Sequence, residues 1–139
     1  MQRIYITFVV VFLCIAGASA QSSNKLVAAS VARGKTVYLQ RCMVCHQADG
    51  GGVPKLNAPL DGSSAVNGSD VSKLIKYIVK GFADRVEIDG ELYSNAMPAA
   101  ADLTDQQIAD VLTFIRSNWS NKAGPVTSLQ VKQTRSKLK

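Results

Sequence analysis

The sequence predicts a mainly helical domain, with three helices and one small hairpin around a long loop. Three segments place apolar residues at helical spacing, and one short segment alternates apolar and polar residues. Residues 47–68 are rich in Gly, Pro, Asn and Ser, which is typical of a loop, and a loop of this length is uncommon unless something functional organises it. The predicted core is thin, and a small domain of this kind often needs a disulfide, metal or cofactor for stability.

The first twenty residues are typical of an export signal. Arg3 supplies a positive start, residues 4–16 are apolar and uncharged, and Ala18-Ser19-Ala20 fits the small-x-small rule for cleavage before Gln21. The alternative is an uncleaved membrane anchor, but the apolar run is shorter than the roughly 20 residues of a spanning helix. We therefore expect an exported protein of the periplasmic space with no integral membrane segment after cleavage. Cys14 would leave with the signal.

The first predicted helix contains Val27, Val31, Gly34 and Tyr38 at helical spacing and ends near Cys42. A second helix follows a cap at Ser69 or Asp70 and stops at Gly81. Its apolar stripe is formed by Val71, Leu74, Ile75, Ile78 and Val79.

A hairpin is predicted over residues 86–93, because apolar and polar residues alternate there around Asp89-Gly90. Thr104 and Gln107 then form a capping box that starts the last long helix. The buried face of this helix is expected to contain Ile108, Val111, Leu112, Ile115 and Trp119.

The basic charge of the chain is concentrated at its C-terminus. The formal net charge is +6, yet residues 21–121 carry ten basic and ten acidic residues, and residues 122–139 carry five basic residues and no acid. This tail can form a short helix after Gly124-Pro125, docked by Val126, Leu129 and Val131. Aromatic residues are scarce among the basic ones, so we expect no nucleic-acid partner.

The motif that carries chemistry is "CMVCH", with Cys42, Cys45 and the single histidine, His46. A disulfide would close a tiny loop and leave His46 unexplained. A thioredoxin-like pair normally follows a strand in a βαβ unit, and a structural zinc ion needs four ligands where the mature chain offers three. C-x-x-C-H is also the attachment signature of c-type haem, in which two thiols on one helical turn reach the two vinyl groups and the imidazole ligates the iron. Export and the thin core agree with this interpretation.

A second axial ligand is expected if the iron only passes electrons. A second histidine does not exist, and Met43 lies inside the attachment motif on the wrong side of the ring. Met97, in "YSNAMPAA", is the remaining methionine of the mature chain. A flexible core residue is the alternative role for it. As a thioether ligand, Met97 would favour ferrous iron and leave no open position for a substrate.

These residues resemble a class I c-type cytochrome over residues 29–121. The resemblance rests on Gly34 and Tyr38 before the motif, "APLDGS", "YSNAMP" and "LTDQQIADVLTFIRSNW". It is especially similar to the small exported domains that accompany quinoprotein or membrane-bound dehydrogenases, or that feed terminal oxidases. The resemblance implies an all-α cytochrome c fold, with three or four helices around one covalently bound haem c. The N- and C-terminal helices would cross where Gly34 lets Phe114 pack closely.

The resemblance also implies roles for loop residues. The Pro59 carbonyl would accept the N–H of His46 and fix the ring. Tyr93 and Asn95 could hydrogen-bond a haem propionate or the methionine sulfur, with plain packing or turn formation as the alternative. Trp119 is expected to be a core anchor.

The resemblance implies a mono-haem carrier of single electrons and no enzyme. Its redox partners would be a periplasmic or membrane dehydrogenase or reductase as donor and a terminal oxidase or reductase as acceptor. The chain would be a monomer or a weakly associated subunit, with a cytochrome domain over residues 21–121 and a basic tail over 122–139. The alternative is a haem enzyme or gas sensor of peroxidase type, which needs a vacated sixth position and usually a distal acid–base residue. The chain has no second histidine for that role.

Overall fold

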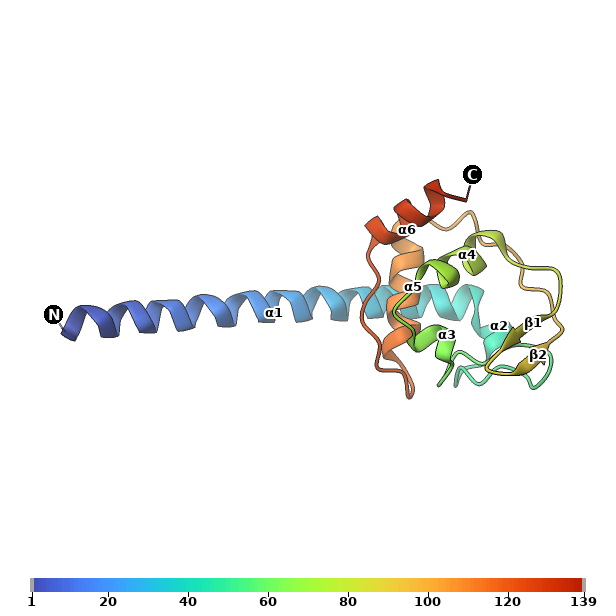
Figure 1. The fold of residues 1–139 in the computed structure, drawn as a ribbon, viewed down its shortest axis with the longest axis horizontal. Helices are drawn as coiled ribbons and strands as arrows, with labels where there is room; N and C mark the ends of the chain where they lie inside the picture. Colours follow the sequence, from blue (N-terminus) through green and yellow to red (C-terminus); the bar gives the residue numbers. More distant parts are fainter. Residues whose placement is uncertain (1, 139) are drawn as a thin grey trace.

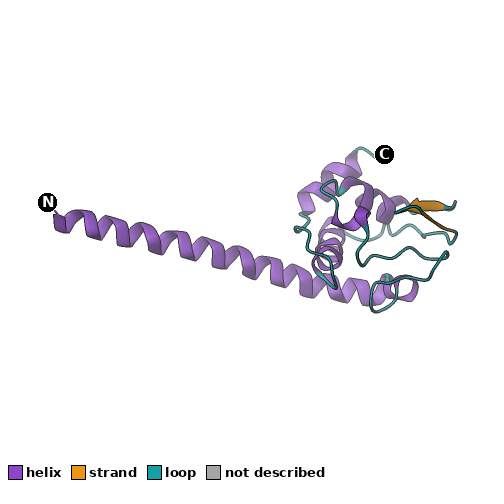
Figure 2. Ribbon diagram, turned by 60° about the horizontal axis from the view of Figure 1, so that its bottom comes forward, coloured by secondary structure: helices purple, strands orange, loops and turns teal. Residues whose placement is uncertain are grey.

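The computed structural model describes the backbone of residues 2–138 and the side chains of residues 22–138. A mainly helical fold with one small hairpin is confirmed. Figure 1 shows a long first helix whose C-terminal end is surrounded by the rest of the chain. Figure 2 shows the loops and the hairpin gathered at the end of the molecule away from the N-terminus. The elements in chain order are α1 (Gln2–Arg41), α2 (Met43–His46), α3 (Ser64–Asn67), α4 (Ser72–Lys80), β1 (Val86–Ile88), β2 (Glu91–Tyr93), α5 (Asp105–Ser117) and α6 (Ser128–Ser136).

Helix α1 includes both the expected export signal and the expected first helix. It ends at Arg41, as the sequence predicts. The signal itself, residues 1–20, lies outside the residues whose side chains are described, so cleavage before Gln21 stays a prediction. Among the described residues, no helix combines the length and apolar character that a membrane span requires.

Helices α1 and α5 cross in close contact at Gly34. A Cβ atom at this position would lie 2.0 Å from the backbone oxygen of Asp110 and 2.9 Å from the Cβ atom of Phe114. Tyr38, one turn further along α1, packs on Phe114 with 5.3 Å between the ring centroids. The close helix crossing that the resemblance implies is therefore present, and it depends on the absence of a side chain at Gly34.

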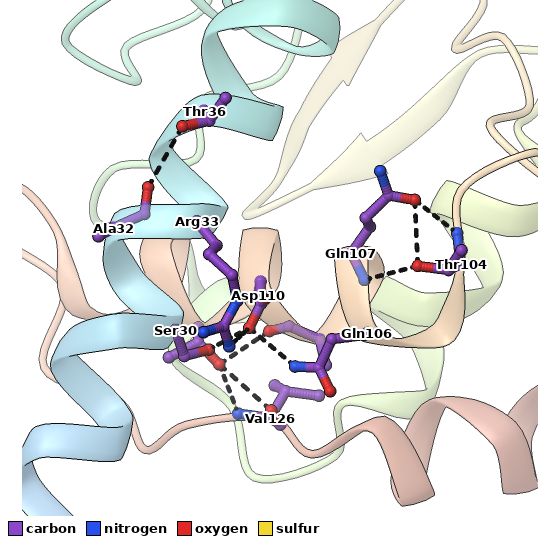
Figure 3. Close-up of polar contacts among 11 residues, drawn as sticks. Ser30, Ala32, Arg33, Thr36, Thr104, Gln106, Gln107, Asp110 and Val126 are labelled. Carbon is purple, nitrogen blue, oxygen red and sulfur yellow. Dashed lines mark hydrogen bonds and ion pairs between the residues drawn. The ribbon is translucent and has the colours of Figure 1, made fainter.

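A polar cluster lies beside this crossing, centred on the carboxylate of Asp110 (Figure 3). Asp110 is 2 % exposed, and its oxygens accept hydrogen bonds from Ser30 at 2.6 Å and from Gln106 at 2.9 Å. Arg33 donates two further bonds, at 2.7 and 2.8 Å. The cluster satisfies a buried charge and fixes the register of α1 against α5.

Replacing Asp110 with Asn should make the protein less stable at neutral pH and less sensitive to acid. Burial acts to raise the pKa of Asp110, but the hydrogen bonds from Arg33, Ser30 and Gln106 outweigh it and hold the pKa below its usual value. The ionised group therefore contributes stability above its unfolded-state pKa, and this contribution is lost as the pH falls through the lower folded-state pKa. We expect Asp110→Asn to lower the free energy of unfolding at pH 7 by about 2 kcal/mol.

The same variant should show a flatter decline of stability below about pH 4, since one linked proton is removed. Denaturant titration at several pH values measures both effects. Asp102→Asn is the control, because Asp102 pairs with Arg41 but keeps 64% of its side chain exposed. This control should change stability by less than about 1 kcal/mol. Equal effects for both variants would contradict a special role for the buried carboxylate.

The second predicted helix and the hairpin are both confirmed. Helix α4 buries Leu74, Ile75, Ile78 and Val79, and Asp70 accepts a hydrogen bond from the Ser72 amide at its start. Gly81 ends the helix with φ +61 and lies against the backbone of Met97. Strands β1 and β2 pair antiparallel, with Asp89 and Gly90 at the turn. The left-handed backbone at both turn residues suits the Asp-Gly sequence.

Helix α5 begins at the predicted capping box, in which Thr104 and Gln107 bond to each other's backbone. The sequence predicted that Trp119 lies on the buried face of this helix. That prediction is wrong, because the helix ends at Ser117 and Trp119 lies beyond it. Trp119 has φ +53, a backbone conformation that cannot continue a right-handed helix. Its ring nevertheless packs on Tyr38 and Phe114, at centroid distances of 5.4 and 5.7 Å.

The chain beyond Asn121 packs on the domain. The short helix predicted there is confirmed as α6, which contacts α4 and α5. Val126 and Val131 are buried, but Leu129 is 61% exposed, so its predicted docking role is wrong. Positions two apart on a helix point about 200° apart, and Leu129 therefore faces solvent when Val131 faces the core.

Two arginines attach this C-terminal segment to the domain. Arg135 of α6 donates to Asp105 at 2.9 Å and to the carbonyl of Leu103 at 2.7 Å. Arg116 of α5 is buried and donates to the carbonyls of Gly124 and Gly68. Arg135, one of the five basic residues of residues 122–139, is therefore used in packing against the domain.

Candidate haem-binding site

Two neighbouring cavities lie between the end of α1 and the segment after the hairpin. The larger has a volume of about 210 Å³, and Cys42, Cys45, His46 and Met97 all line it. The smaller has a volume of about 80 Å³ and is also lined by Cys42, His46 and Met97. The fold thus brings together the four residues that the sequence singles out, although Met97 is far from the others in the chain.

The motif "CMVCH" forms a tight turn at the end of α1. The amide of Cys42 donates to the Tyr38 carbonyl at 2.9 Å, and the amides of Cys45 and His46 donate to the Cys42 carbonyl at 3.1 and 3.0 Å. Both thiols are free and half-buried. Burial raises the pKa of Cys42 to about 11, which keeps it a thiol at neutral pH. One turn therefore presents two thiols and an imidazole to the same cavity.

His46 is held through its ring nitrogen Nδ1, which lies 2.9 Å from the carbonyl oxygen of Ala58. Burial lowers the pKa of His46, against the opposing effect of this hydrogen bond, and so favours the neutral imidazole. With Nδ1 donating to a carbonyl, Nε2 keeps its lone pair for a metal ion.

This hydrogen bond corrects the prediction for Pro59. The predicted acceptor was the Pro59 carbonyl, but the structure uses the carbonyl one residue earlier. The reason lies in the loop register. The Leu60 amide donates to the Gly50 carbonyl at 2.7 Å, and in a trans peptide the preceding carbonyl, that of Pro59, points the opposite way. Pro59 still lines the smaller cavity.

Met97 lines both cavities and belongs to the segment after the hairpin. Its backbone forms a pair of hydrogen bonds with Phe82, at 2.9 and 3.0 Å, directly after the end of α4. Met43, in contrast, packs against the hydrophobic core and lines neither cavity. The structure therefore places one methionine where it faces the site.

The segment that contains Asn95 is hydrogen-bonded to the loop at residues 55–57. The side-chain amide of Asn95 donates to the Asn57 side chain at 3.0 Å, and its backbone amide donates to the Leu56 carbonyl at 3.0 Å. A third bond runs from the Ser94 amide to the Lys55 carbonyl, also at 3.0 Å. We call these three bonds the Asn57–Asn95 clamp. The described hydrogen bonds of Asn95 are thus with the loop at residues 55–57. Its predicted bond to a propionate or to the methionine sulfur stays a prediction.

Tyr93 is buried at 9% exposure and lines the larger cavity beside Asn95. Its predicted hydrogen bond likewise stays a prediction. Sequence analysis missed Ala58, Asn57 and Phe82 as parts of the site. Phe82 had a signal, since it follows the helix stop at Gly81, whereas Ala58 and Asn57 depend on the path of a loop.

Comparison with known proteins identifies the family. The family model described as cytochrome c matches residues 31–119. The chain belongs to the cytochrome c family. The matched residues include the attachment motif, Met97, all of α5 and the end of α1 that crosses α5 at Gly34.

Relatives of this cytochrome include subunits of dehydrogenases and a cytochrome c-552. It is 36% identical over 125 residues to the cytochrome c subunit of a quinone alcohol dehydrogenase from Gluconacetobacter polyoxogenes. The matched region covers 82% of this chain and 25% of that subunit. It is 36% identical over 95 residues to the cytochrome c subunit of gluconate 2-dehydrogenase from Pantoea cypripedii, with 65% and 21% covered. It is 32% identical over 119 residues to cytochrome c-552 of Thermus thermophilus, with 80% of each chain covered. The chain spans about a quarter of the alcohol dehydrogenase subunit.

The site of this cytochrome fits haem c, which the family binds covalently. Apolar side chains from α4 and α5, among them Ile78, Leu112 and Ile115, line the cavities and suit the faces of a porphyrin. The thiols of Cys42 and Cys45 lie on one turn, as attachment to two vinyl groups requires. The imidazole of His46 and the thioether of Met97 line the same cavities and are donor groups that could bind a haem iron.

Proposed function

We propose that this cytochrome carries single electrons between a dehydrogenase or reductase, in the periplasm or the membrane, and an acceptor such as a terminal oxidase. The observation that carries the proposal is that His46 and Met97, which are 51 positions apart in the sequence, line the same two cavities together with Cys42. Cys42 and Cys45 would hold the haem by thioether bonds, and His46 and Met97 would be its axial ligands. When bound, the haem iron supplies a one-electron couple between its ferrous and ferric states.

The chain's own residues would fill both axial positions of the iron and leave one edge of the haem accessible to a partner. Ala58 orients His46, and the backbone bonds to Phe82 hold Met97. At the mouth of the larger cavity, Val44 is 81% exposed and Ala96 and Ala99 are exposed as well. Small apolar residues allow a partner to approach without strong binding, which suits a transient interface below about 1,200 Å².

Three features support the proposed donor, compartment and oligomeric state, one feature for each. The names of two relatives link similar domains to alcohol and gluconate dehydrogenases. The sequence pattern of residues 1–20, which predicts an export signal, supports a periplasmic location. The match to cytochrome c-552, which covers 80% of that protein, supports a chain that acts as a monomer or a weakly associated subunit.

Replacing Met97 with Ala should open the sixth coordination position. The ferric protein should lose the weak far-red band of methionine-ligated haem, and the midpoint potential should fall, because a thioether favours ferrous iron. The ferrous variant should bind carbon monoxide rapidly, whereas the unmodified protein should not. Absorption spectroscopy and redox titration measure these changes.

Met43→Leu is the matched control, because Met43 lines neither cavity. It should leave the far-red band and the potential unchanged. An unaltered spectrum for Met97→Ala would show that another group binds the iron. Rapid carbon monoxide binding and efficient peroxide turnover by the unmodified protein would instead favour the haem enzyme or gas sensor.

A further inference from the structure

We propose that Tyr38 and Trp119 are positioning residues for His46, acting through the two backbone carbonyls that follow it. The inference rests on the proposed function, since it takes His46 to be an iron ligand. Neither aromatic residue lines the two cavities, so neither is placed to act by direct contact there.

Gln47, directly after His46, has an unusual backbone conformation. Its φ is +63 and its ψ is 166, a region that residues other than glycine rarely adopt. Such a conformation costs about 1–3 kcal/mol and persists only when its surroundings hold it. Whatever holds Gln47 also fixes the direction in which the chain leaves the histidine.

Tyr38 holds this residue from inside the domain. Its hydroxyl donates to the Gln47 carbonyl at 2.5 Å, and the side chain is 1% exposed. The backbone carbonyl of Tyr38 also accepts the amide of Cys42 at 2.9 Å. Tyr38 therefore bonds at both ends of the attachment motif. It accepts from the amide of the first cysteine, and it donates to the carbonyl of the residue that follows the histidine. Burial raises the pKa of Tyr38, so its hydroxyl remains a donor.

Trp119 is hydrogen-bonded to the next residue of the loop, Ala48. Its indole Nε1 donates to the Ala48 carbonyl at 3.2 Å. The indole ring also packs on Tyr38, so the two donors support each other. Gly50 lies against the same ring, where a Cβ atom would be 2.8 Å from the nearest carbons.

Gly50, which lies against the Trp119 ring, is also hydrogen-bonded to the part of the loop that holds the imidazole. The carbonyl of Gly50 accepts the amides of Leu60 and Asp61, at 2.7 and 3.0 Å. These residues directly follow the Ala58-Pro59 pair, and the Ala58 carbonyl is the partner of His46 Nδ1. The His46 ring is thus fixed at its backbone by Tyr38 and at Nδ1 by a loop that packs on Trp119.

The test uses the full haem-loaded protein and two conservative variants. Tyr38→Phe removes one hydroxyl, and Trp119→Phe removes one N–H while keeping a ring on the half-exposed surface. Val131→Ala is the control, since Val131 is buried in α6 and takes no part in this network. The main measurement is the pattern of paramagnetically shifted haem-methyl proton signals in the ferric protein, which depends on the orientation of the axial imidazole.

Tyr38→Phe and Trp119→Phe should both change the pattern of haem-methyl signals. Val131→Ala should leave the pattern unchanged, even if it lowers the denaturation midpoint as much as the two aromatic substitutions do. The acid pH at which the low-spin spectrum is lost should also rise by about half a unit or more in the two aromatic variants, a threefold easier displacement of the histidine. Loss of stability with an unchanged methyl pattern in both aromatic variants would overturn the proposal. An unmodified protein whose spectrum shows no imidazole ligation would overturn the proposed function itself, so the two failures are distinguishable.

Discussion

Replacing both Cys42 and Cys45 with Ala should yield a protein whose pigment is extracted by acid–acetone, whereas the unmodified protein should keep its colour after denaturation. Both thiols are free and line the larger cavity, so both are available for thioether bonds. The double variant should also lose most of its helical signal in circular dichroism. The cavities of about 210 and 80 Å³ lie inside a small core, and a chain of this size loses much of its buried surface when they empty.

The matched control for this experiment is Cys14→Ala, because Cys14 lies in the predicted export signal. Its product should keep covalent pigment in the same yield per protein. Extractable pigment in the unmodified protein, or retained pigment in the double variant, would show that the haem is not attached through these cysteines.

Replacing Gly34 with Ala should destabilise the haem-loaded protein by about 3 kcal/mol, the upper part of the range for overpacked cores. The added Cβ atom would lie 2.0 Å from the Asp110 backbone oxygen, so α1 and α5 must move apart. That movement would also disturb the bonds of Ser30 and Arg33 to Asp110. Alanine is the better helix former by about 1 kcal/mol, and this gain should be overwhelmed.

Gly124→Ala provides the comparison, since a Cβ atom there would meet nothing within 4 Å. It should change the free energy of unfolding by less than about 0.5 kcal/mol. Chemical denaturation of both variants, monitored by far-UV circular dichroism, gives the two values. A Gly34→Ala variant as stable as Gly124→Ala would mean that the helices can separate at little cost.

Much of the fold follows from local sequence signals. The capping box at Thr104, the Asp89-Gly90 turn and the helix stop at Gly81 each depend on a few neighbouring residues. The attachment motif is equally local, since one turn carries all three of its chemical groups. These features could be predicted because their geometry is decided within about one helical turn.

The features that sequence reasoning missed depend on paths through space. The acceptor for His46 moved by one residue, from Pro59 to Ala58, because distant loop bonds to Gly50 set the register. Leu129 was placed in the core although Val131 takes that face. Trp119 was placed on a helix that ends two residues before it.

The Asn57–Asn95 clamp has a consequence for the speed of electron transfer. Its three hydrogen bonds join the loop after His46 to the segment that leads to Met97, so they oppose a shift of one segment relative to the other. A redox centre reacts fastest when its surroundings need little rearrangement between oxidation states. With these two segments joined, the side chains proposed as iron ligands, His46 and Met97, would keep one common frame as the charge on the site changes. The clamp therefore favours a small inner reorganisation energy, which a carrier needs at every turnover.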